Sequence, residues 1–246
     1  MSVRFANPDR ANALAPDMLD QLAGILRAPS GRVRVVLLGG AGDRHFSGGL
    51  DLGERTADEL VEFLPAQEER LRRAADAVAQ CPVPVIGVVN GAAFGGALEL
   101  AISCDWRIAA RRARFGMPAA RLGVVYAPEG LARFVAAIGP ARTKQLFLTG
   151  DPVDAARAVE IGLVEQVVAD AEIWQFAESA AAAVVSAAPL AVEGTRAAID
   201  ALAHGEVPAD VQQAAARARG KAFASDDFRE ALAAAREKRA AEFHDR

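Results

Sequence analysis

Two glycine turns constrain the fold of this 246-residue chain more than any other feature. Residues 46–52 read Phe-Ser-Gly-Gly-Leu-Asp-Leu, and residues 90–99 read Asn-Gly-Ala-Ala-Phe-Gly-Gly-Ala-Leu-Glu. Each turn comes after an apolar run typical of a buried strand, where the chain should pass into a helix. Glycine lets a ligand approach the backbone closely, so such a turn can present an N–H group to a pocket. Two N–H groups that converge on one oxygen form an oxyanion hole.

Composition narrows the class of protein. A hydrophobic fraction of 52% in 246 residues suits a globular α/β protein with one large domain, or a domain with a small helical appendage. The net charge is −4, and the basic residues are scattered among acidic ones, so we expect no nucleic-acid partner. The longest apolar run, 83–98, is interrupted by Pro84 and Asn90, and we expect no membrane span.

Signals for metals, dinucleotides and export are missing from the sequence. It contains no His/Cys cluster and no Gly-x-Gly-x-x-Gly turn. Cys81 and Cys104 are expected to be buried, reduced thiols. The first residues lack the charged-then-apolar pattern of a signal peptide, so a cytoplasmic location is expected.

Hydrophobic patterning predicts strands and helices in alternation, followed by a helical region. Strands are expected at 34–38, 85–89, 106–109 and 113–116, and helices at 58–64, 65–80, 95–102 and 131–138. Pro65 is expected to end one helix and begin the next. This order favours stacked parallel units. From residue 154 the pattern is almost wholly helical, at 154–161, 171–187, 189–204, 208–223 and 225–241.

Nearly the whole chain resembles the crotonase superfamily, also called the enoyl-CoA hydratase/isomerase family. The two glycine turns carry most of the resemblance, with further support from the segments 7–14, 114–118, 147–168 and 231–243. The resemblance implies an α/β fold with a crotonase-like ββα spiral core at 1–190. It also implies a helical C-terminal region at 191–246 that makes trimer contacts in related proteins, so a homotrimer or hexamer is expected.

The resemblance also implies a site for an acyl-CoA thioester. The backbone N–H groups of Leu50 and Gly96 would form the oxyanion hole, and coenzyme A would enter as part of the substrate, with no separate cofactor. The residues expected to bind substrate or coenzyme A are Arg10, Ala11, Ala13, Gly48, Gly49, Asp51, Leu52 and Gly95.

Three positions bear on the reaction: two glutamates, Glu99 and Glu129, and Ala119, which stands where related hydratases have a second glutamate. Glu99 matches one of the two catalytic glutamates of enoyl-CoA hydratases, although a charge at a helix start is the alternative. The second glutamate should follow Pro118, where this chain has Ala119. Hydration usually needs two positioned carboxyl groups. Glu129 is a third candidate, because some isomerases and dehalogenases of the family use an acid in this region; an exposed helix-start charge is its alternative.

Segment 122–126, Leu-Gly-Val-Val-Tyr, is similar to a segment of methylmalonyl-CoA decarboxylases. In those enzymes the tyrosine helps position the substrate carboxylate, a role that would fall to Tyr126; a core tyrosine is the alternative. The sequence therefore favours decarboxylation of a malonyl-type acyl-CoA through a thioester enolate. The alternatives are an enoyl-CoA hydratase or isomerase that uses Glu99, with or without Glu129, and a catalytically idle acyl-CoA-binding paralogue.

Overall fold

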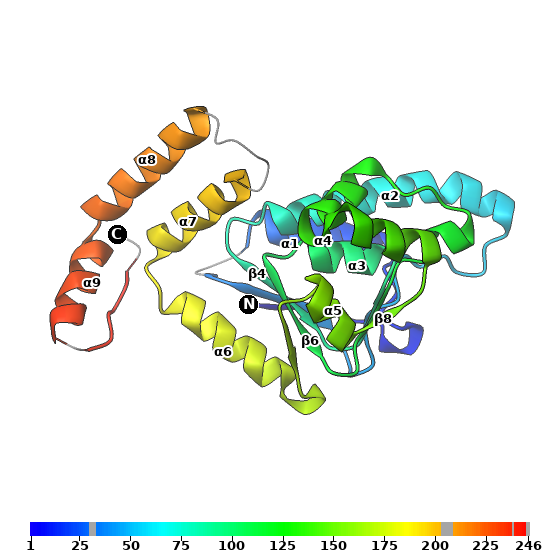
Figure 1. Cartoon of the computed structure of the whole chain (residues 1–246), viewed down its shortest axis with the longest axis horizontal. Coiled ribbons are helices and arrows are strands. Elements are labelled where there is room, and N and C mark those ends of the chain that lie inside the picture. The colour runs from blue at the N-terminus through cyan, green and yellow to red at the C-terminus, as the bar shows by residue number, and fades with distance from the viewer. Residues whose placement is uncertain (30–32, 203–208, 238, 245–246) are drawn as a thin grey trace. The chain divides into compact units, whose positions relative to one another are not determined.

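The chain divides into two compact units, Met1–Glu178 and Ser179–Arg246. The computed structural model describes residues 1–29, 33–202, 209–237 and 239–244 (Figure 1). The division falls inside helix α6 (Ile173–Val185), before the predicted boundary between residues 190 and 191. The role of 191–246 in oligomerisation stays a prediction.

Two sheets form the first unit. The larger sheet is wholly parallel, in the order β1 (Ser2–Phe5), β2 (Val36–Gly40), β4 (Val85–Val89), β6 (Trp106–Ala110) and β9 (Gln166–Val168). The smaller sheet has the order β3 (His45–Ser47), β5 (Ala92–Phe94), β7 (Arg114–Gly116) and β8 (Val153–Asp154), and only β8 runs antiparallel to its neighbour.

The chain builds these sheets as a spiral. Each turn adds one strand to the larger sheet, one strand to the smaller sheet and then a helix: β2, β3 and α2 (Ala57–Ala79), then β4, β5 and α3 (Gly96–Ile102), then β6, β7 and α4 (Pro128–Thr149). This arrangement confirms the predicted ββα spiral. Its consequence is that the loops after β3 and β5, which carry the two glycine turns, lie next to each other.

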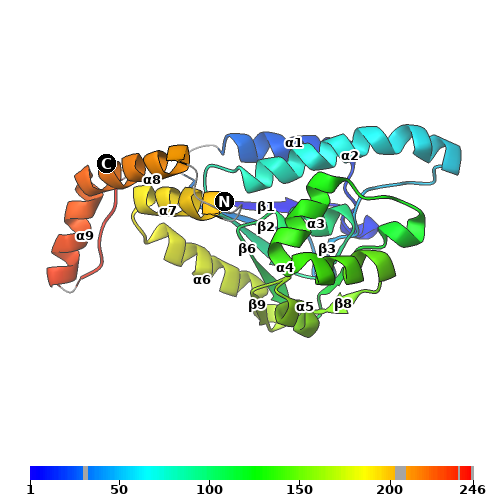
Figure 2. The ribbon, with the colours of Figure 1, turned by 45° about the horizontal axis from the view of Figure 1, so that its top comes forward.

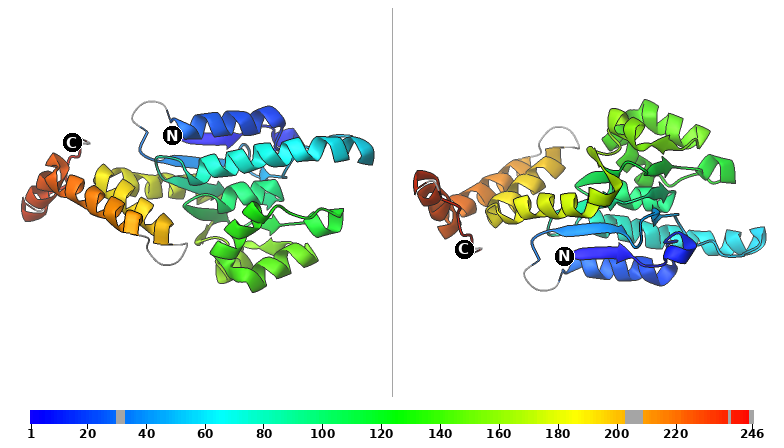
Figure 3. Two further views of the ribbon diagram at one scale, coloured as in Figure 1. Left: turned by 90° about the horizontal axis from the view of Figure 1, so that it is seen from above. Right: turned by 90° about the horizontal axis from the view of Figure 1, so that it is seen from below.

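Helices α1 (Pro16–Arg27), α2, α3 and α4 lie side by side over the sheets (Figures 2 and 3). The short helices η1 (Pro8–Arg10), η2 (Ala119–Leu122), η3 (Asp170–Glu172) and α5 (Ala155–Ile161) complete the unit. The larger helices bury one face each; on α2 that face includes Leu71, Ala75 and Val78, as the sequence predicts.

The predicted break at Pro65 is wrong, because α2 runs through that residue without interruption. A proline inside a helix removes the hydrogen bond to the carbonyl four residues earlier. Here that carbonyl belongs to Val61, whose side chain is 73% exposed, so solvent can bond the carbonyl instead. A capping box formed by Thr56 and Glu59 further stabilises the start of this helix.

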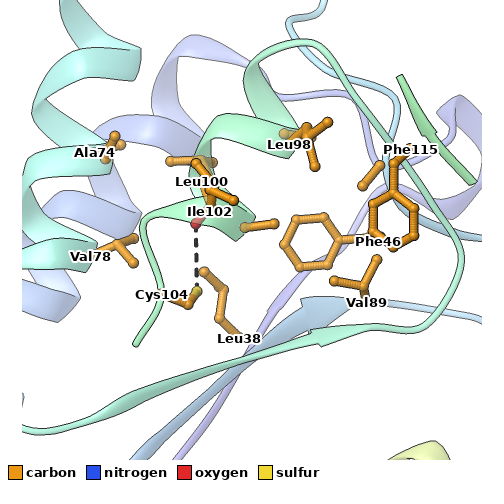
Figure 4. Packing of buried hydrophobic residues seen from close by; sticks show 14 of the residues in the cluster. Leu38, Phe46, Ala74, Val78, Val89, Leu98, Leu100, Ile102, Cys104 and Phe115 are labelled. Carbon is orange, nitrogen blue, oxygen red and sulfur yellow. Dashed lines mark hydrogen bonds between the residues drawn. The ribbon is translucent and has the colours of Figure 1, made fainter. Parts of the chain in front are cut away.

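The core lies between the sheets and the helix layer. Figure 4 shows how its side chains interlock, with α2 contributing Ala74 and Val78, α3 contributing Leu98, Leu100 and Ile102, and the strands contributing Leu38, Phe46, Val89 and Phe115. Both cysteines are buried and unbridged, as predicted, and burial raises the pKa of the Cys104 thiol. A close-packed layer of this kind fixes the backbone of the two turns that it supports.

The second unit is helical, with α7 (Pro189–Leu202), α8 (Ala209–Ala224) and α9 (Asp226–Glu237). These helices match three predicted ones, except that α9 ends at Glu237 and residues 239–241 of the predicted helix 225–241 are not helical. The predicted ends at 204 and 208 lie outside the described residues. No single helix in the described part of the chain has the length and hydropathy to cross a membrane, while the bent pair Asp170–Val185 and Pro189–Leu202 meets that test by length and composition only.

Candidate active site

The first glycine turn follows β3 and needs glycine at position 49. Gly49 has a φ of +99°, and a Cβ built there would lie 2.8 Å from the carbonyl oxygen of Phe94. The turn is pinned to Leu14, whose N–H donates to the Gly49 carbonyl (2.8 Å) and whose carbonyl accepts from the Asp51 N–H (3.0 Å). Between these two bonds, the Leu50 N–H donates to no group among the described residues.

The second turn begins α3. Gly95 caps the helix with a φ of +53°, and Gly96 is the first helical residue. A Cβ at Gly49 would lie 3.7 Å from the Gly96 nitrogen, and a Cβ at Gly96 would lie 3.6 Å from Leu50 Cγ. The two turns therefore lie next to each other. That the N–H groups of Leu50 and Gly96 form an oxyanion hole stays a prediction.

Two buried asparagines hold the backbone behind these turns. The Asn90 side chain accepts from the Gly40 N–H (2.9 Å) and donates to the carbonyls of Gly40 (3.1 Å) and Gly42 (2.9 Å). The Asn12 amide donates to the carbonyls of Ala41 and His45, both at 2.9 Å. The loop 40–46 is thus fixed from both sides, and this network was not predicted from the sequence.

A cavity of about 290 Å³ opens beside the two turns. Most of the predicted site residues line it: Gly48, Gly49, Leu50, Leu52, Gly95, Gly96, Glu99, Tyr126 and Glu129. Apolar side chains form much of the remaining wall, including Leu60, Leu64 and Leu71 of α2 and Met117, Ala119, Leu122 and Val124 near η2. Ala119 therefore presents a methyl group to the cavity at the position where a second carboxylate was sought.

Four predicted binding residues lie outside this cavity. Arg10 and Asp51 form an ion pair of 2.9 Å on the wall of a second hollow of about 430 Å³, which Arg55 also lines. Ala11 adopts a φ of +53°, and its carbonyl accepts from the Gly48 N–H at 2.8 Å. Ala13 lines neither hollow, and its N–H donates to the Arg10 carbonyl.

Glu99 is the buried carboxyl of the cavity. It lies on the first turn of α3 and is 4% exposed, and its Oε2 accepts a hydrogen bond from the Tyr126 hydroxyl at 2.6 Å. Burial raises the pKa of Glu99 above its ordinary value, against the opposing effects of the Tyr126 hydrogen bond and the nearby Arg133 charge. Burial and the charge of Glu99 together raise the pKa of Tyr126 well above its usual range.

Gly130 makes the contact between Glu99 and Tyr126 possible. A Cβ at this position would lie 2.6 Å from Tyr126 Cε1 and 3.1 Å from Glu99 Oε2. The first turn of α4 therefore leaves the space that the Glu99–Tyr126 pair fills. Glu129, the preceding residue, is exposed and lines the same cavity.

Sequence reasoning missed the charged residues that α2 and α4 add to the site. Glu68 and Arg72 of α2 line the cavity, and Asp76 of the same helix binds Arg72 Nη1 at 2.7 Å and the guanidinium of Arg133. The helical pattern could have placed Glu68, Arg72 and Asp76 on one stripe, since they are spaced by four residues. No sequence signal indicated which structure that stripe faces.

This arrangement can move a proton next to a carbonyl group. An oxygen held by the N–H groups of Leu50 and Gly96 would be stabilised as it gains negative charge. A carboxyl on the same wall can give or take a proton during the reaction. No group of three or more His, Cys, Asp and Glu side chains suited to a metal occurs in the described part of the chain.

Comparison with known proteins places the chain among acyl-CoA enzymes. The family model described as enoyl-CoA hydratase/isomerase matches residues 1–246. The crotonyl-CoA hydratase of Syntrophomonas wolfei is 35% identical over 99% of this chain and 94% of its own length, and the short-chain-enoyl-CoA hydratase of Clostridium acetobutylicum is 35% identical over 96% and 91%. The crystal structure of an enoyl-CoA hydratase from Bacillus anthracis matches with a TM-score of 0.91 and 32% identity, covering 100% of this chain and 95% of that one.

Proposed function

The chain belongs to the enoyl-CoA hydratase/isomerase family, and from that premise we propose that it hydrates or isomerises an enoyl-CoA thioester by proton transfer through Glu99. The observation that carries this proposal is the buried Glu99 carboxyl, held by the Tyr126 hydroxyl on the wall of the cavity that the two glycine turns share. The thioester carbonyl would lie between the N–H groups of Leu50 and Gly96.

The proposed steps conserve atoms and protons. In isomerisation, Glu99 removes a proton from one carbon of the acyl chain, the electrons move into the thioester enolate, and Glu99 returns the proton two carbons away. In hydration, Glu99 takes a proton from water as the oxygen attacks the β-carbon, and the same proton then reaches the α-carbon. One carboxyl group suffices for each reaction, because Glu99 begins as a carboxylate, takes up one proton and is a carboxylate again once it has returned that proton. This fits a site where Ala119 offers no second acid.

Decarboxylation, which the sequence favoured, receives no support from the named relatives, and the hydratase/isomerase alternative takes its place. Two features of the site agree with this choice. The Tyr126 hydroxyl donates its hydrogen bond to Glu99, so it has no proton left to donate to a substrate carboxylate. The carboxylate of a malonyl-type substrate would share the cavity with the carboxyl groups of Glu68, Glu99 and Glu129 and with the guanidinium of Arg72, so the acidic groups on the wall outnumber the basic one.

The ends of the substrate can be assigned in the same proposal. Coenzyme A carries phosphates, and the guanidinium groups of Arg10 and Arg55 on the wall of the second hollow would bind them, in competition with the carboxylates of Asp51, Glu54 and Glu59 on the same wall. The apolar wall near η2 would hold the acyl chain. A homotrimer or hexamer and a cytoplasmic location remain predictions.

A substrate panel tests the proposal. The purified chain is incubated with crotonyl-CoA, a 3-enoyl-CoA and methylmalonyl-CoA, and products are identified by mass spectrometry and chromatography. We expect gain of water or a shifted double bond, with a loss of about 10²- to 10⁴-fold in kcat for Glu99→Gln. The matched control, Glu160→Gln on the exposed face of α5, should keep full activity. Release of CO2 faster than any conversion of the enoyl thioesters, unaffected by Glu99→Gln, would overturn the proposal.

A further inference from the structure

Arg133 reaches from α4 toward the carboxyl of Glu99 without lining the cavity. Its Nε lies 3.7 Å from Glu99 Oε1, with the two side chains 20% and 6% exposed. The Nη2 of the same guanidinium binds Asp76 on α2. The Nε is buried and finds no hydrogen-bond partner among the residues that the structure describes. A buried donor of this kind without a partner is uncommon and usually has a reason.

Each carboxyl oxygen of Glu99 faces a different side chain. Tyr126 donates to Oε2 at 2.6 Å, while Arg133 Nε faces Oε1. A separation of 3.7 Å is an ion pair but exceeds hydrogen-bond distance. Catalytic hydrogen bonds often tighten when substrate binds, and a movement of about 0.5 Å would close this one. Asp76 restrains that movement, because it holds the Nη2 of the same guanidinium.

We propose that Arg133 is a positioning residue that orients the Glu99 carboxylate and favours its charged form, with Asp76 limiting how closely Arg133 approaches. The inference rests on the proposed function, since it acts through Glu99. Arg133 itself touches no substrate. Its contribution is to fix Oε1 while Tyr126 fixes Oε2, so that one carboxyl can take a proton and return it in a constant orientation.

The charges that face Glu99 come from two elements, and they oppose each other. Arg133 and the Tyr126 hydrogen bond favour the carboxylate, whereas burial and the charges of Asp76 and Glu129 favour the neutral acid. The strands packed on α3 carry two further ionisable residues, His45 on β3 and Arg107 on β6, but neither lines the cavity that Glu99 lines. Arg107 is bound by Glu165 and the Leu163 carbonyl. Glu68 and Arg72 of α2 complete the ionisable groups on the cavity wall.

Two substitutions should therefore move the titration of Glu99 in opposite directions. Arg133→Met removes a positive charge, so the Glu99 pKa rises and the acid limb of the kcat/KM profile moves to higher pH. Asp76→Asn removes a negative charge and releases Arg133 to approach Oε1, so the pKa falls and the same limb moves to lower pH. General damage to the fold would not produce shifts of opposite sign.

The experiment reads Glu99 directly and kinetically. Protein labelled with 13C at the glutamate δ-carbon is titrated by NMR, with Glu99→Gln used to assign the signal, and pH–rate profiles are recorded on the enoyl-CoA that the substrate panel identifies. For Arg133→Met we expect kcat to fall about tenfold or more, with KM changed by less than about twofold. Arg133→Lys keeps the charge and should restore the position of the acid limb.

The controls separate this inference from the proposed function. Lys144→Met removes a positive charge from the exposed face of the same helix and should alter neither the titration nor the profile. An unchanged Glu99 titration in Arg133→Met overturns the inference, even if Glu99 proves catalytic. Full turnover in Glu99→Gln overturns the proposed function, while the NMR titration still reports whether Arg133 acts on Glu99. Far-UV and near-UV circular dichroism spectra check that each variant is folded. In Arg133→Met, Asp76 still has Arg72 as an ion-pair partner, so no carboxylate is left unpaired there.

Discussion

At the scale of single residues, Glu99 illustrates a conflict between function and stability. A carboxyl buried beside an apolar cavity is poorly solvated, and its pKa is raised in the folded chain. In the unfolded chain the same group titrates near its ordinary value of about 4.3. The contribution of Glu99 to the free energy of unfolding is therefore most favourable below about pH 4.3, the pKa in the unfolded chain. This contribution is lost as the pH rises through the higher pKa of Glu99 in the folded chain.

We accordingly expect Glu99→Gln to be more stable than the unmodified chain at pH 8, although it is the less active protein. The amide can still accept the Tyr126 hydrogen bond, and no buried charge remains at this position. A rise in Tm of roughly 2–4 °C is expected at pH 8, which corresponds to about 1 kcal/mol in a chain of this size, and the gain should vanish near pH 4. Thermal melts across this pH range provide the measurement. Equal Tm values at pH 8 would show that the carboxylate carries no desolvation cost.

At the scale of secondary-structure elements, the site depends on how strand ends are joined. Asn90 connects the end of β4 to the end of β2 through three hydrogen bonds to Gly40 and Gly42. The N–H and carbonyl of Gly40 lie in the interior, where no solvent can replace a lost partner, whereas Gly42 is exposed. The loop that leads to the first glycine turn is therefore only as rigid as this side-chain link.

Asn90→Ala should loosen both turns together. We expect a loss of about 1–3 kcal/mol in the free energy of unfolding, because the buried N–H and carbonyl of Gly40 lose their side-chain partner. We also expect kcat to fall by about tenfold or more, since the two N–H donors would no longer be held in register. Chemical denaturation and steady-state kinetics on the same samples give both values. Gln145→Ala, an amide removed from the exposed side of α4, is the control; a similar loss there would contradict the argument.

The glycine turns were predictable from sequence, but the charged residues behind the site were not. Gly49 and Gly95 adopt positive φ angles that other residues avoid. The presence of glycine at these positions therefore indicates the conformation of each turn. Arg133 and Asp76 look like ordinary surface charges in the sequence, and only the packing of α2 and α4 around α3 brings them to Glu99. The helix break predicted at Pro65 was wrong for a related reason. The cost of a proline inside a helix depends on whether water can bond the carbonyl four residues earlier, and the sequence does not show this.

At the scale of the whole molecule, the second unit leaves apolar side chains uncovered. Ile199, Leu202 and Phe223 are 60%, 51% and 62% exposed, and all three line a groove formed by α7 and α8. Grouped apolar exposure of this kind is typical of surfaces that bind another chain. The homotrimer or hexamer expected from the sequence stays a prediction, and this groove is the surface on which we test it.

Phe223→Asp should weaken that assembly, because it places a charge on a surface expected to be covered by another copy. Sedimentation velocity of the unmodified chain should give the mass of three or six copies, and the variant should shift toward one copy at micromolar concentration. Ile25→Asp, on the exposed face of α1, serves as the control for a charge introduced elsewhere. A monomeric mass for the unmodified chain would contradict the prediction.

The paired glycine turns have a consequence for how such a protein can change over time. The groups that would stabilise the developing charge are main-chain N–H groups, which every residue type except proline provides. The wall that would meet the acyl chain, by contrast, is made of replaceable side chains such as Ala119, Leu122 and Val124 on or beside the short helix η2. Selectivity for a new thioester can therefore evolve, or be engineered, by exchanging a few neighbouring residues while the inherited electrostatic machinery stays in place.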